Sequence, residues 1–360
     1  MFNDFFKNKK ILVTGHTGFK GSWLSLWLGY MGAKLAGVSL GYKNTSRIFI
    51  KNSRIKNYFF NIQEYKKLEK CIIKEQPDII FHLAAQALVS ESYSNPLETY
   101  KTNILGMINL LNILKNFKKK CSVILITSDK VYKNLEQIRG YKEGDILHGK
   151  DPYSASKSCA DILAQSYIES IFKKKKNINF GIARAGNVIG GGDLSENRIV
   201  PDLVKSVKNN KKLIIRQPNS TRPWQHVIEI IYGYLKFSKY LYESKKKLEI
   251  LNFGPRKNYN FKVIDVVMKA SQYFNLKYEI KNKNLFFKES KLLKLNSEKA
   301  KKIIFWTSRL NFNETIDLTM KWYNKYINKK NNNQLYLETI NQIRNYYLKI
   351  QNVPNKKNKK

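Results

Sequence analysis

The segment VTGHTGFKGSWL, residues 13–24, decides the fold of this chain. It continues the apolar run Ile11–Val13 through three evenly spaced glycines into a helical pattern, so it predicts a strand, a glycine turn and a helix. Gly15 permits the tight bend, Gly18 lets the backbone approach a pyrophosphate, and Gly21 lets the helix pack closely on the strand. The N–H groups at the helix start attract phosphate. We interpret the segment as a dinucleotide site, with a purely structural glycine turn as the alternative.

Strands and helices alternate after this first unit. Short apolar runs bounded by turn residues predict strands, and longer periodic stretches predict helices. The predicted strands cover about residues 34–40, 58–62, 78–84, 123–127 and 179–184. One predicted helix ends at about residue 74, and two others cover about residues 99–116 and 153–172. Short apolar strands joined by helices form a parallel sheet covered on both faces, so the predicted fold class is α/β, a Rossmann-type doubly wound parallel sheet.

The alternation breaks after Arg184 into glycine-rich and proline-containing segments, which predict a smaller, partly interleaved C-terminal substrate domain. Near the C-terminus, the stretch LYLETINQIRNYYLKI predicts one more helix. The boundaries that we expect are residues 1–187 together with about 226–254 for the dinucleotide-binding domain, 188–225 and 255–330 for the substrate-binding domain, and 331–360 for a Lys/Asn-rich C-terminal tail.

Composition narrows the class of protein. The 360-residue chain is 42% hydrophobic and 26% charged, which excludes wholesale disorder. Its 66 Lys and Arg against 27 Asp and Glu give a net charge of +39, and such a field attracts any polyanion. The excess is spread along the chain as Lys interleaved with Asn and Ile, not gathered around a nucleic-acid motif. We interpret it as compositional drift at solvated positions and expect no specific nucleic-acid partner.

Signals for a membrane, a metal or a disulfide are weak in this sequence. The longest early apolar stretch, Gly21–Ala33, is shorter than the roughly 20 residues of a membrane-spanning helix. The N-terminus lacks an apolar signal region, so we expect a cytoplasmic protein with no membrane partner. The three cysteines and four histidines show no metal-ligand spacing, so we expect neither a disulfide framework nor a metal site.

The segment DPYSASK, residues 151–157, places Tyr153 and Lys157 on one face of a predicted helix. A cation beside a phenol favours the phenolate and lowers its pKa from about 10. By chance alone, about four Tyr residues of this chain would be followed by Lys or Arg at this spacing. The spacing is therefore weak evidence for a catalytic pair, and the sequence around the pair has to decide. The pair follows an apolar strand that leads into Ser128, at the sheet edge where ligands of open α/β folds bind. The three side chains together can polarise a hydroxyl and remove its proton.

Further motifs extend this pattern to about Tyr326. They are HLAAQALV (82–89), SYSNPLETYKTNILG (92–106), TSDKVY (127–132), GYKEGDILHGKDPYSASK (140–157), ARAGNVIGGGD (183–193), NRIVPD (197–202) and RPWQHV (222–227). With the glycine loop they resemble the extended short-chain dehydrogenase/reductase superfamily. Within it they resemble the CDP-glucose 4,6-dehydratase branch of the NAD-dependent epimerase/dehydratase family, because GHTGFKGSWL, SDK followed by DPYSASK, and RPWQHV are narrower signals than the loop and the Tyr/Lys pair.

The resemblance implies dehydration of a nucleotide sugar, CDP-glucose, in deoxysugar and surface polysaccharide biosynthesis. C4 of the glucosyl unit is oxidised, water is eliminated across C5 and C6, and hydride returns to C6, giving CDP-4-dehydro-6-deoxy-D-glucose. Tyr153 is the implied base, with Lys157 lowering its pKa and Ser128 orienting the hydroxyl. Asp129 is the implied acid that protonates the C6 oxygen. Lys130 stands where dTDP-glucose relatives have a glutamate base. It either abstracts the C5 proton in its neutral form or only orients substrate or water.

The resemblance also implies the binding residues and NAD as the cofactor. The implied cofactor contacts are Gly15, His16, Gly18, Phe19, Lys20, Gly21, Asn61, Ile62, Leu83, Ala84, Ala85, Gln86, Tyr153 and Lys157. The implied substrate contacts are Asn187, Arg198, Arg222 and Ser128, of which Arg222 provides bidentate donors for a diphosphate. For Trp224 and His226, packing or helix capping is the stronger alternative. Because this superfamily dimerises through helices near residues 103–114 and 153–167, we expect a homodimer or homotetramer.

The choice between NAD and NADP depends on the end of the second predicted strand, where an acid usually binds the ribose diol. The segment Ser39–Tyr42 contains no acid, and Lys43 and Arg47 would suit a 2′-phosphate. The dehydratase branch tolerates the missing acid, so NAD remains the expected cofactor.

Other functions stay open at this point. Another NDP-hexose 4,6-dehydratase would differ only in its nucleotide base. A nucleotide-sugar 4-epimerase shares the glycine loop and the Tyr/Lys pair but needs no elimination acid, so Asp129 and Lys130 are the discriminating residues. A basic polyanion-binding protein on a degenerate Rossmann scaffold is the rival from a different class, and the intact set of Ser128, Tyr153 and Lys157 argues against it.

Overall fold

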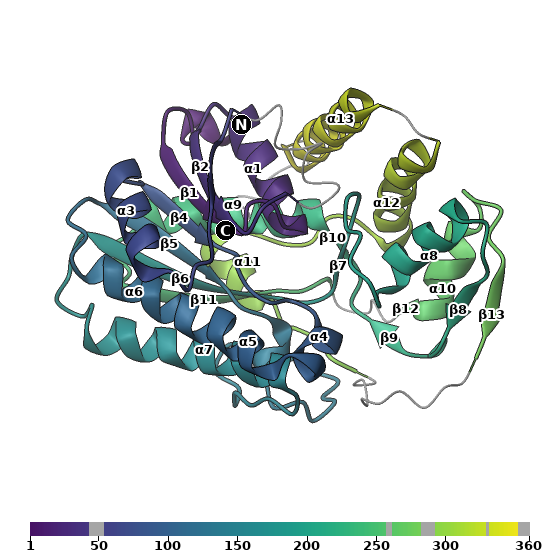
Figure 1. The fold of residues 1–360 in the computed structure, drawn as a ribbon, viewed down its shortest axis with the longest axis horizontal. Helices are drawn as coiled ribbons and strands as arrows, with labels where there is room; N and C mark the ends of the chain where they lie inside the picture. The colour runs from purple at the N-terminus through teal and green to yellow at the C-terminus, as the bar shows by residue number, and fades with distance from the viewer. Residues whose placement is uncertain (43–53, 257–260, 282–291, 329–330, 352–360) are drawn as a thin grey trace, which may run out of the picture.

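A seven-stranded parallel sheet organises the larger of two lobes in the computed structural model, which describes residues 1–42, 54–256, 261–281, 292–328 and 331–351 (Figure 1). The strand order is β11-β6-β5-β4-β1-β2-β3, so the chain winds outward in both directions from the neighbours β1 and β4. The strands are β1 (Lys10–Thr14), β2 (Lys34–Ser39), β3 (Lys56–Phe59), β4 (Ile79–His82), β5 (Cys121–Ile126), β6 (Ile178–Ala185) and β11 (Leu248–Phe253). The predicted doubly wound α/β class is confirmed.

Helices cover both faces of the sheet because successive side chains of a strand point to opposite faces. Ile11 and Val13 of β1 belong to the core beneath α1 and α9, whereas Leu12 belongs to the core beneath α3, α6 and α7. These helices span Phe19–Tyr30 (α1), Tyr65–Glu75 (α3), Gly106–Lys115 (α6), Pro152–Ser170 (α7) and Val227–Glu243 (α9). A buried parallel sheet of this kind explains why its strands read as continuous apolar runs.

The helix predicted at residues 99–116 is present with nearly those bounds. Helical backbone runs without a break from Pro96 to Lys115, as α5 (Pro96–Tyr100), a π-helical segment (Lys101–Leu105) and α6. Pro96 stands at its first position, where a proline costs no hydrogen bond. A separate short helix, α4 (Val89–Ser94), precedes it. The π-helical segment was not predicted, because a periodic apolar pattern does not show where a chain changes helix type.

The smaller lobe lies beside the carboxyl edge of the sheet and is built from two-stranded pairs and helices (Figure 1). Its pairs are β7 (Val188–Ile189) with β10 (Gln225–His226), β8 (Leu213–Ile215) with β13 (Tyr278–Ile280), and β9 (Thr221–Arg222) with β12 (Phe261–Lys262). The remaining helices and turns are α8 (Ile199–Lys208), α10 (Val263–Ala270), α11 (Glu298–Ile304), α12 (Phe312–Ile327), α13 (Asn332–Gln351), and the 3₁₀ turns Phe2–Asp4 and Asp129–Val131. No helix among these described residues is long and apolar enough to cross a membrane.

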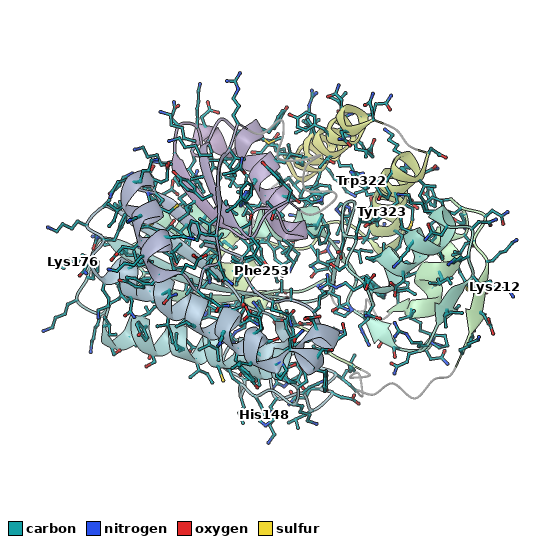
Figure 2. All side chains as sticks on the ribbon, viewed as in Figure 1. His148, Lys176, Lys212, Phe253, Trp322 and Tyr323 are labelled. Carbon is teal, nitrogen blue, oxygen red and sulfur yellow. The ribbon has the colours of Figure 1, made fainter. Side chains whose placement is uncertain are left out.

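Helix α13 packs against both α1 of the larger lobe and α12 of the smaller lobe. Trp322 of α12 donates its indole N–H to Thr339 Oγ1 at 2.9 Å, and Trp27 of α1 meets the ring of Tyr346 edge-on. Figure 2 labels Trp322 on α12. The Tyr347 hydroxyl accepts the Phe2 backbone N–H at 2.7 Å. The last described helix therefore connects both lobes and the N-terminus.

A buried ion pair holds α7 against the sheet. Arg184 of β6 donates to both carboxylate oxygens of Asp161 at 2.9 and 2.7 Å, and the two side chains are 1% and 0% exposed. Thr127 donates a third hydrogen bond to the Asp161 carboxylate at 2.9 Å. The Arg184 guanidinium also donates to the Tyr132 hydroxyl at 2.8 Å. Every charge in this pair has partners on neighbouring elements, so the network fixes the position of the helix that carries Tyr153.

We predict that Arg184→Met lowers the free energy of unfolding by about 3–5 kcal/mol, because it leaves the Asp161 carboxylate buried without its partner. Urea denaturation monitored by circular dichroism measures this loss. The exposed pair Lys205–Glu196 provides the matched control, since removing an exposed ion pair by Lys205→Met should change stability by about 1 kcal/mol or less. Equal effects of the two substitutions would show that the buried pair does not stabilise α7.

Candidate active site

The glycine loop lies tightly against the end of β4. Gly15 has φ +74°, and a Cβ atom there would lie 2.7 Å from the Ala84 nitrogen. A Cβ atom on Gly21 would lie 2.1 Å from the Gly15 carbonyl oxygen. Gly18 caps α1 and is exposed, so the backbone at the start of this helix is open to a ligand. Only glycine fits at Gly15 and Gly21, and the resulting cradle at a helix N-terminus fits a pyrophosphate.

His16 fills the space beneath the loop. Its imidazole is fully buried and shares a hydrogen bond with Asn57 Oδ1 at 2.8 Å, and it stacks on the ring of Phe59. Gly37 makes room for it, because a Cβ atom there would lie 2.3 Å from the imidazole Cγ. Burial lowers the pKa of His16. The structure thus joins this predicted cofactor residue to β2 and β3, on the side where the ribose acid is missing. Lys43 and Arg47 lie outside the described residues.

The other predicted cofactor residues follow β3 and β4. Asn61 accepts the Gln63 N–H at 3.0 Å, and Ile62 is buried against Gly106 of α6. Leu83, Ala84 and Ala85 are half-buried, and the first two lie directly beside Gly15. The Gln86 side chain donates to Leu88 O and to Thr99 Oγ1, at 3.0 and 2.9 Å, so it shapes its own loop.

Three predicted catalytic side chains interact with one another. Ser128 Oγ donates to Asp129 Oδ1 at 3.0 Å, and the Ser128 side chain also interacts with the Tyr153 phenol. Asp129 is 3% exposed and lies next to Gly186, where a Cβ atom would be 3.1 Å from Asp129 Oδ2. Lys130 is half-buried, and its backbone N–H donates to Ser128 Oγ at 3.2 Å. One serine hydroxyl therefore links a phenol to a carboxyl group.

Burial raises the pKa of the Tyr153 phenol. The neighbouring Ser128 side chain acts in the opposite direction, the negative charge of Asp129 adds to the rise, and the positive charge of Arg198 opposes it. The start of α7 is fixed by Asp151, whose side chain accepts the Ser154 N–H at 2.9 Å. A buried phenol keeps its proton until nearby donors and cations stabilise the phenolate, so the neighbours of Tyr153 set its reactivity.

Lys157 lies one helical turn beyond Tyr153 and points toward the end of β5. Its ammonium donates to the Ile126 carbonyl at 3.4 Å. Burial, together with the positive charge of Lys20, lowers the pKa of Lys157 to about 8, although Asp161 acts in the opposite direction. The role that the resemblance implies for Lys157, lowering the pKa of Tyr153, stays a prediction.

The sequence did not predict the interactions of two residues of the site, His82 and Lys20. His82 ends β4 and shares a hydrogen bond with Thr14 at 2.9 Å, and burial and the positive charge of Lys157 lower its pKa to about 3. Lys20 stays a predicted cofactor contact, and its ammonium also interacts electrostatically with Asp129, Asp193 and Arg198. Burial and the Arg198 charge lower the pKa of Lys20 to about 8, and the two carboxylates oppose this. The signal for His82 was its position at the carboxyl end of a central strand.

Of the predicted substrate residues, Arg198 and Arg222 lie on segments of the smaller lobe, Asn187 comes just after β6, and Ser128 follows β5. Arg198 forms an ion pair with Asp193 at 3.1 Å and donates to the Ala87 carbonyl at 3.3 Å, so it connects the two lobes. Asn187 follows β6, and its carbonyl accepts the Gln225 N–H at 3.3 Å. Arg222 is half-buried in β9, where it donates to the Thr221 carbonyl at 2.9 Å.

Trp224 and His226 have structural positions. The Trp224 indole N–H donates to the Phe261 carbonyl at 3.1 Å. His226 caps α9 by accepting the Ile228 N–H at 3.3 Å, and burial lowers its pKa to about 3. Within the described ranges, no group of three or more His, Cys, Asp or Glu side chains could hold a metal ion.

The model of the GDP-mannose 4,6 dehydratase family matches residues 12–319, a span that holds the glycine loop, Ser128, Asp129, Tyr153 and the first half of α12. The chain belongs to this family. It is 39% identical to the CDP-glucose 4,6-dehydratase of Salmonella typhimurium over 90% of this chain and 93% of that protein. It is 33% identical to the dTDP-D-glucose 4,6-dehydratase of Dictyostelium discoideum over 63% of this chain and 54% of that protein. The predicted membership of the epimerase/dehydratase group is confirmed.

Solved structures of related enzymes share the family fold. A UDP-glucose 4-epimerase superimposes with a TM-score of 0.77 at 20% identity, covering 89% of this chain and 99% of that one. The dTDP-glucose 4,6-dehydratase of Bacillus anthracis, solved in complex with NAD, superimposes with a TM-score of 0.72 at 22% identity, covering 88% and 96%. These similarities show the fold of the family.

We predict that the buried imidazoles of His82 and His226 make the fold sensitive to acid. Their pKa values of about 3 lie below the roughly 6.5 of an unfolded histidine. Between these values the unfolded chain binds more protons, so the free energy of unfolding falls as the pH falls. Each imidazole should account for about 2 kcal/mol of the loss between pH 7 and pH 5.

Urea denaturation at pH 7 and pH 5 tests this sensitivity. His82→Gln should lose less stability between the two pH values than the unmodified protein. The control is His148→Gln, since His148 is exposed and points outward (Figure 2). If His82→Gln shows the same pH 7 to pH 5 loss as His148→Gln, the buried imidazole does not titrate on unfolding.

Proposed function

We propose that the protein catalyses the NAD-dependent dehydration of CDP-glucose to CDP-4-dehydro-6-deoxy-D-glucose. The observation that carries this proposal is the position of Ser128, which donates to Asp129 at 3.0 Å and interacts with the Tyr153 phenol. The proposed base for a sugar hydroxyl and the proposed acid for a leaving hydroxyl thus share one neighbour, and an epimerase needs only the base. The similarity to the CDP-glucose 4,6-dehydratase of Salmonella typhimurium, which extends over 90% of this chain, supports the same substrate.

The glycine cradle fits NAD, with the pyrophosphate above Gly18 at the N-terminus of α1. We propose that the half-buried segment Leu83–Gln86 contacts the same cofactor, because it lies against Gly15 at the carboxyl edge of the sheet. When bound, the nicotinamide ring supplies reversible hydride transfer. The residues of this chain supply proton transfer, orientation and exclusion of water.

Tyr153 is the proposed base for the C4 hydroxyl. Burial raises its pKa, so the phenol loses its proton only with the help of Ser128, Arg198 and, as we propose, Lys157. Ser128, which interacts with Tyr153 and donates to Asp129, is the proposed residue that orients the sugar hydroxyl. This arrangement makes proton removal depend on a filled, water-free site, where each electrostatic contact is stronger than in water.

Asp129 is the proposed acid for the C6 oxygen. It is nearly fully buried, lies between Ser128 and Gly186, and faces the segments that carry the predicted substrate residues. For Lys130 we propose the orienting role. A lysine accepts a proton only when neutral, which requires deep burial or a cationic neighbour, and this side chain is only half-buried.

Both lobes supply proposed contacts to the nucleotide sugar. Arg222 of the smaller lobe would bind the diphosphate, Asn187 after β6 would face the sugar beside Ser128, and Arg198 would close the site from its position between the lobes. We propose that residues 1–187 with about 226–254 bind the cofactor, and that 188–225 and 255–330 bind the substrate. A cytoplasmic location suits both ligands. Exposed Leu105 and Ile162, beside α6 and on α7, suit the proposed homodimer.

We predict that the purified protein acts on CDP-glucose in preference to dTDP-, UDP- and GDP-glucose, and that it uses NAD in preference to NADP. Incubation with each nucleotide sugar, followed by identification of the sugar by mass spectrometry, tests both choices. Loss of 18 mass units from the sugar indicates dehydration. A product of unchanged mass with an inverted C4 centre would identify an epimerase instead. Activity with NADP alone would overturn the cofactor assignment.

We predict that Asp129→Asn lowers dehydration by roughly 10²–10⁴-fold, the usual contribution of a positioned general acid, while substrate binding persists. Tyr153→Phe should block the reaction one step earlier, at C4 oxidation. Rapid-mixing absorbance at the reduced-nicotinamide band, read beside product formation, separates the two variants: the band forms with Asp129→Asn and is absent with Tyr153→Phe. Turnover of Asp129→Asn at the unmodified rate would show that Asp129 is not the acid.

A further inference from the structure

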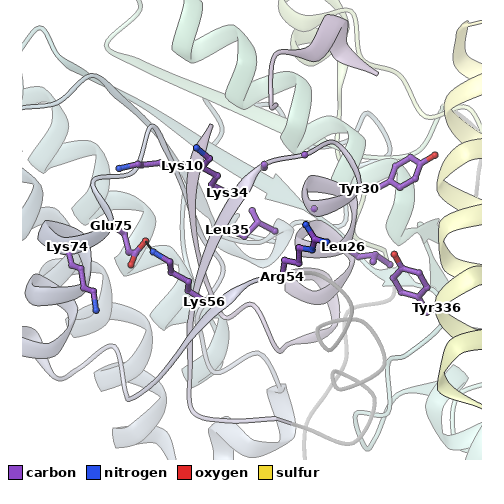
Figure 3. Close-up of a pocket in the computed structure, with 13 residues that line it drawn as sticks. Lys10, Leu26, Tyr30, Lys34, Leu35, Arg54, Lys56, Lys74, Glu75 and Tyr336 are labelled. Atoms are coloured by element: carbon purple, nitrogen blue, oxygen red, sulfur yellow. Dashed lines mark hydrogen bonds and ion pairs between the residues drawn. The ribbon is translucent and has the colours of Figure 1, made fainter. Parts of the chain in front are cut away.

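A cavity lies at the edge of the sheet opposite the candidate active site. It has a volume of about 680 Å³ and opens where β1, β2 and β3 begin and where α1 and α3 end (Figure 3). Its lining residues are Lys10, Leu26, Gly29, Tyr30, Gly32, Ala33, Lys34, Leu35, Arg54, Lys56, Lys74, Glu75 and Tyr336. Sites for small molecules usually occupy about 300–1,000 Å³, so the cavity has a suitable size for one.

The topology gathers positive charge at this edge. Parallel strands begin side by side, and Lys10 pairs in register with Lys34, while Lys56 begins the next strand. Arg54 precedes that strand, and Lys74 comes from the last turn of α3. Five cations therefore line the cavity beside a single carboxylate, Glu75.

The nearby carboxylates leave most of this charge unbalanced. Glu75 is bound by Lys56 at 3.4 Å and by the Tyr58 hydroxyl at 2.5 Å. Asp78, at the start of β4, accepts the Lys10 backbone N–H at 2.8 Å and pairs with Lys119 at 2.7 Å. In the part of the chain that the structure describes, the side chains of Lys10, Lys34 and Arg54 form no ion pair.

Aromatic side chains lie at the other end of the cavity. Tyr30, from the end of α1, is 45% exposed, and Tyr336 approaches from α13 (Figure 3). The cations at the starts of β1 and β2 lie on the far side of Leu35 from both rings. A ligand that spans the cavity would thus meet positive charge at one end and stacking surfaces at the other.

We propose that this cavity binds a nucleoside polyphosphate, with its phosphates at Lys10 and Lys34 and its base against Tyr30 and Tyr336. The concave shape favours a small ligand over a nucleic acid, whose backbone needs an extended basic groove. Exposed lysines also occur far from the cavity, for example Lys176 and Lys212 at opposite ends of the molecule (Figure 2). The test must therefore separate this site from the general positive field.

The site is independent of the proposed dehydratase function but physically connected to the candidate active site. Helix α1 ends at Tyr30 in the cavity and begins beside Gly18 in the glycine loop. A ligand at one end of this helix can change cofactor binding at the other only if it binds the two states of the loop differently. The inference concerns binding, and activity is not needed to test it.

Titration calorimetry with CTP at physiological salt tests the proposal. Saturating NAD and CDP are present throughout, so that the candidate active site is occupied. The unmodified protein should bind one CTP, and Lys10→Gln/Lys34→Gln should weaken binding by about tenfold or more. The control is Lys173→Gln/Lys174→Gln, which removes the same charge from exposed positions after α7 and should change affinity by less than about twofold. Matching unfolding midpoints ensure that both double variants are folded.

Tyr30→Ala and inorganic tripolyphosphate test the nucleoside part of the proposal. CTP should bind more tightly than tripolyphosphate, and Tyr30→Ala should weaken CTP alone. Equal affinity for the two probes would overturn the stacking role of Tyr30. Equal weakening by the two double-lysine variants would assign the binding to the general field, and no heat of binding for the unmodified protein would overturn the site as a whole.

Discussion

The close contact between the glycine loop and the end of β4 is the constraint on which the site depends. With any side chain at Gly15 or Gly21, the turn after β1 could not lie against Ala84, and α1 could not begin where it does. The same contact brings the carboxyl ends of β1 and β4 together, the two strands from which the chain winds in opposite directions. The contacts that the larger lobe is proposed to make with NAD and the nucleotide sugar lie at this edge of the sheet, because only there do the loops of both halves diverge.

The proposed catalytic residues depend on a second constraint, the fixed position of α7 against the sheet. Tyr153 and Lys157 lie on its first turns, while Asp161 lies one turn further and is bound to Arg184 of β6. The same Arg184 reaches Tyr132, in the segment that follows Ser128 and Asp129. The buried Arg184 guanidinium thus holds α7, which carries Tyr153, in a fixed position relative to the loop that carries Asp129. An error of 1 Å between these groups would matter for catalysis, so a costly buried charge has a clear use here.

Sequence patterns predict the strands of the sheet more readily than the arrangement of the site residues. The strands from β1 to β6 were predictable because continuous apolar runs and glycine turns are local signals, and the Tyr153 and Lys157 pair was visible from its helical spacing. The π-helical segment within the helix at residues 96–115 was not predictable, since apolar periodicity does not distinguish the two helix types. Nor was the electrostatic interaction of Lys20 with Asp129, Asp193 and Arg198. These residues come from three distant segments, and only tertiary packing decides which charges a flexible lysine meets.

The position of α13 bears on how the molecule can move. This helix touches α1 and α12, which belong to different lobes, and its Tyr347 holds the backbone of Phe2. Helix α13 and the N-terminal residues therefore link the two lobes. Any rotation of one lobe against the other has to slide α1 or α12 along α13. Relative movement of the lobes is thereby tied to the contacts of Trp27, Trp322 and Tyr346, three large side chains.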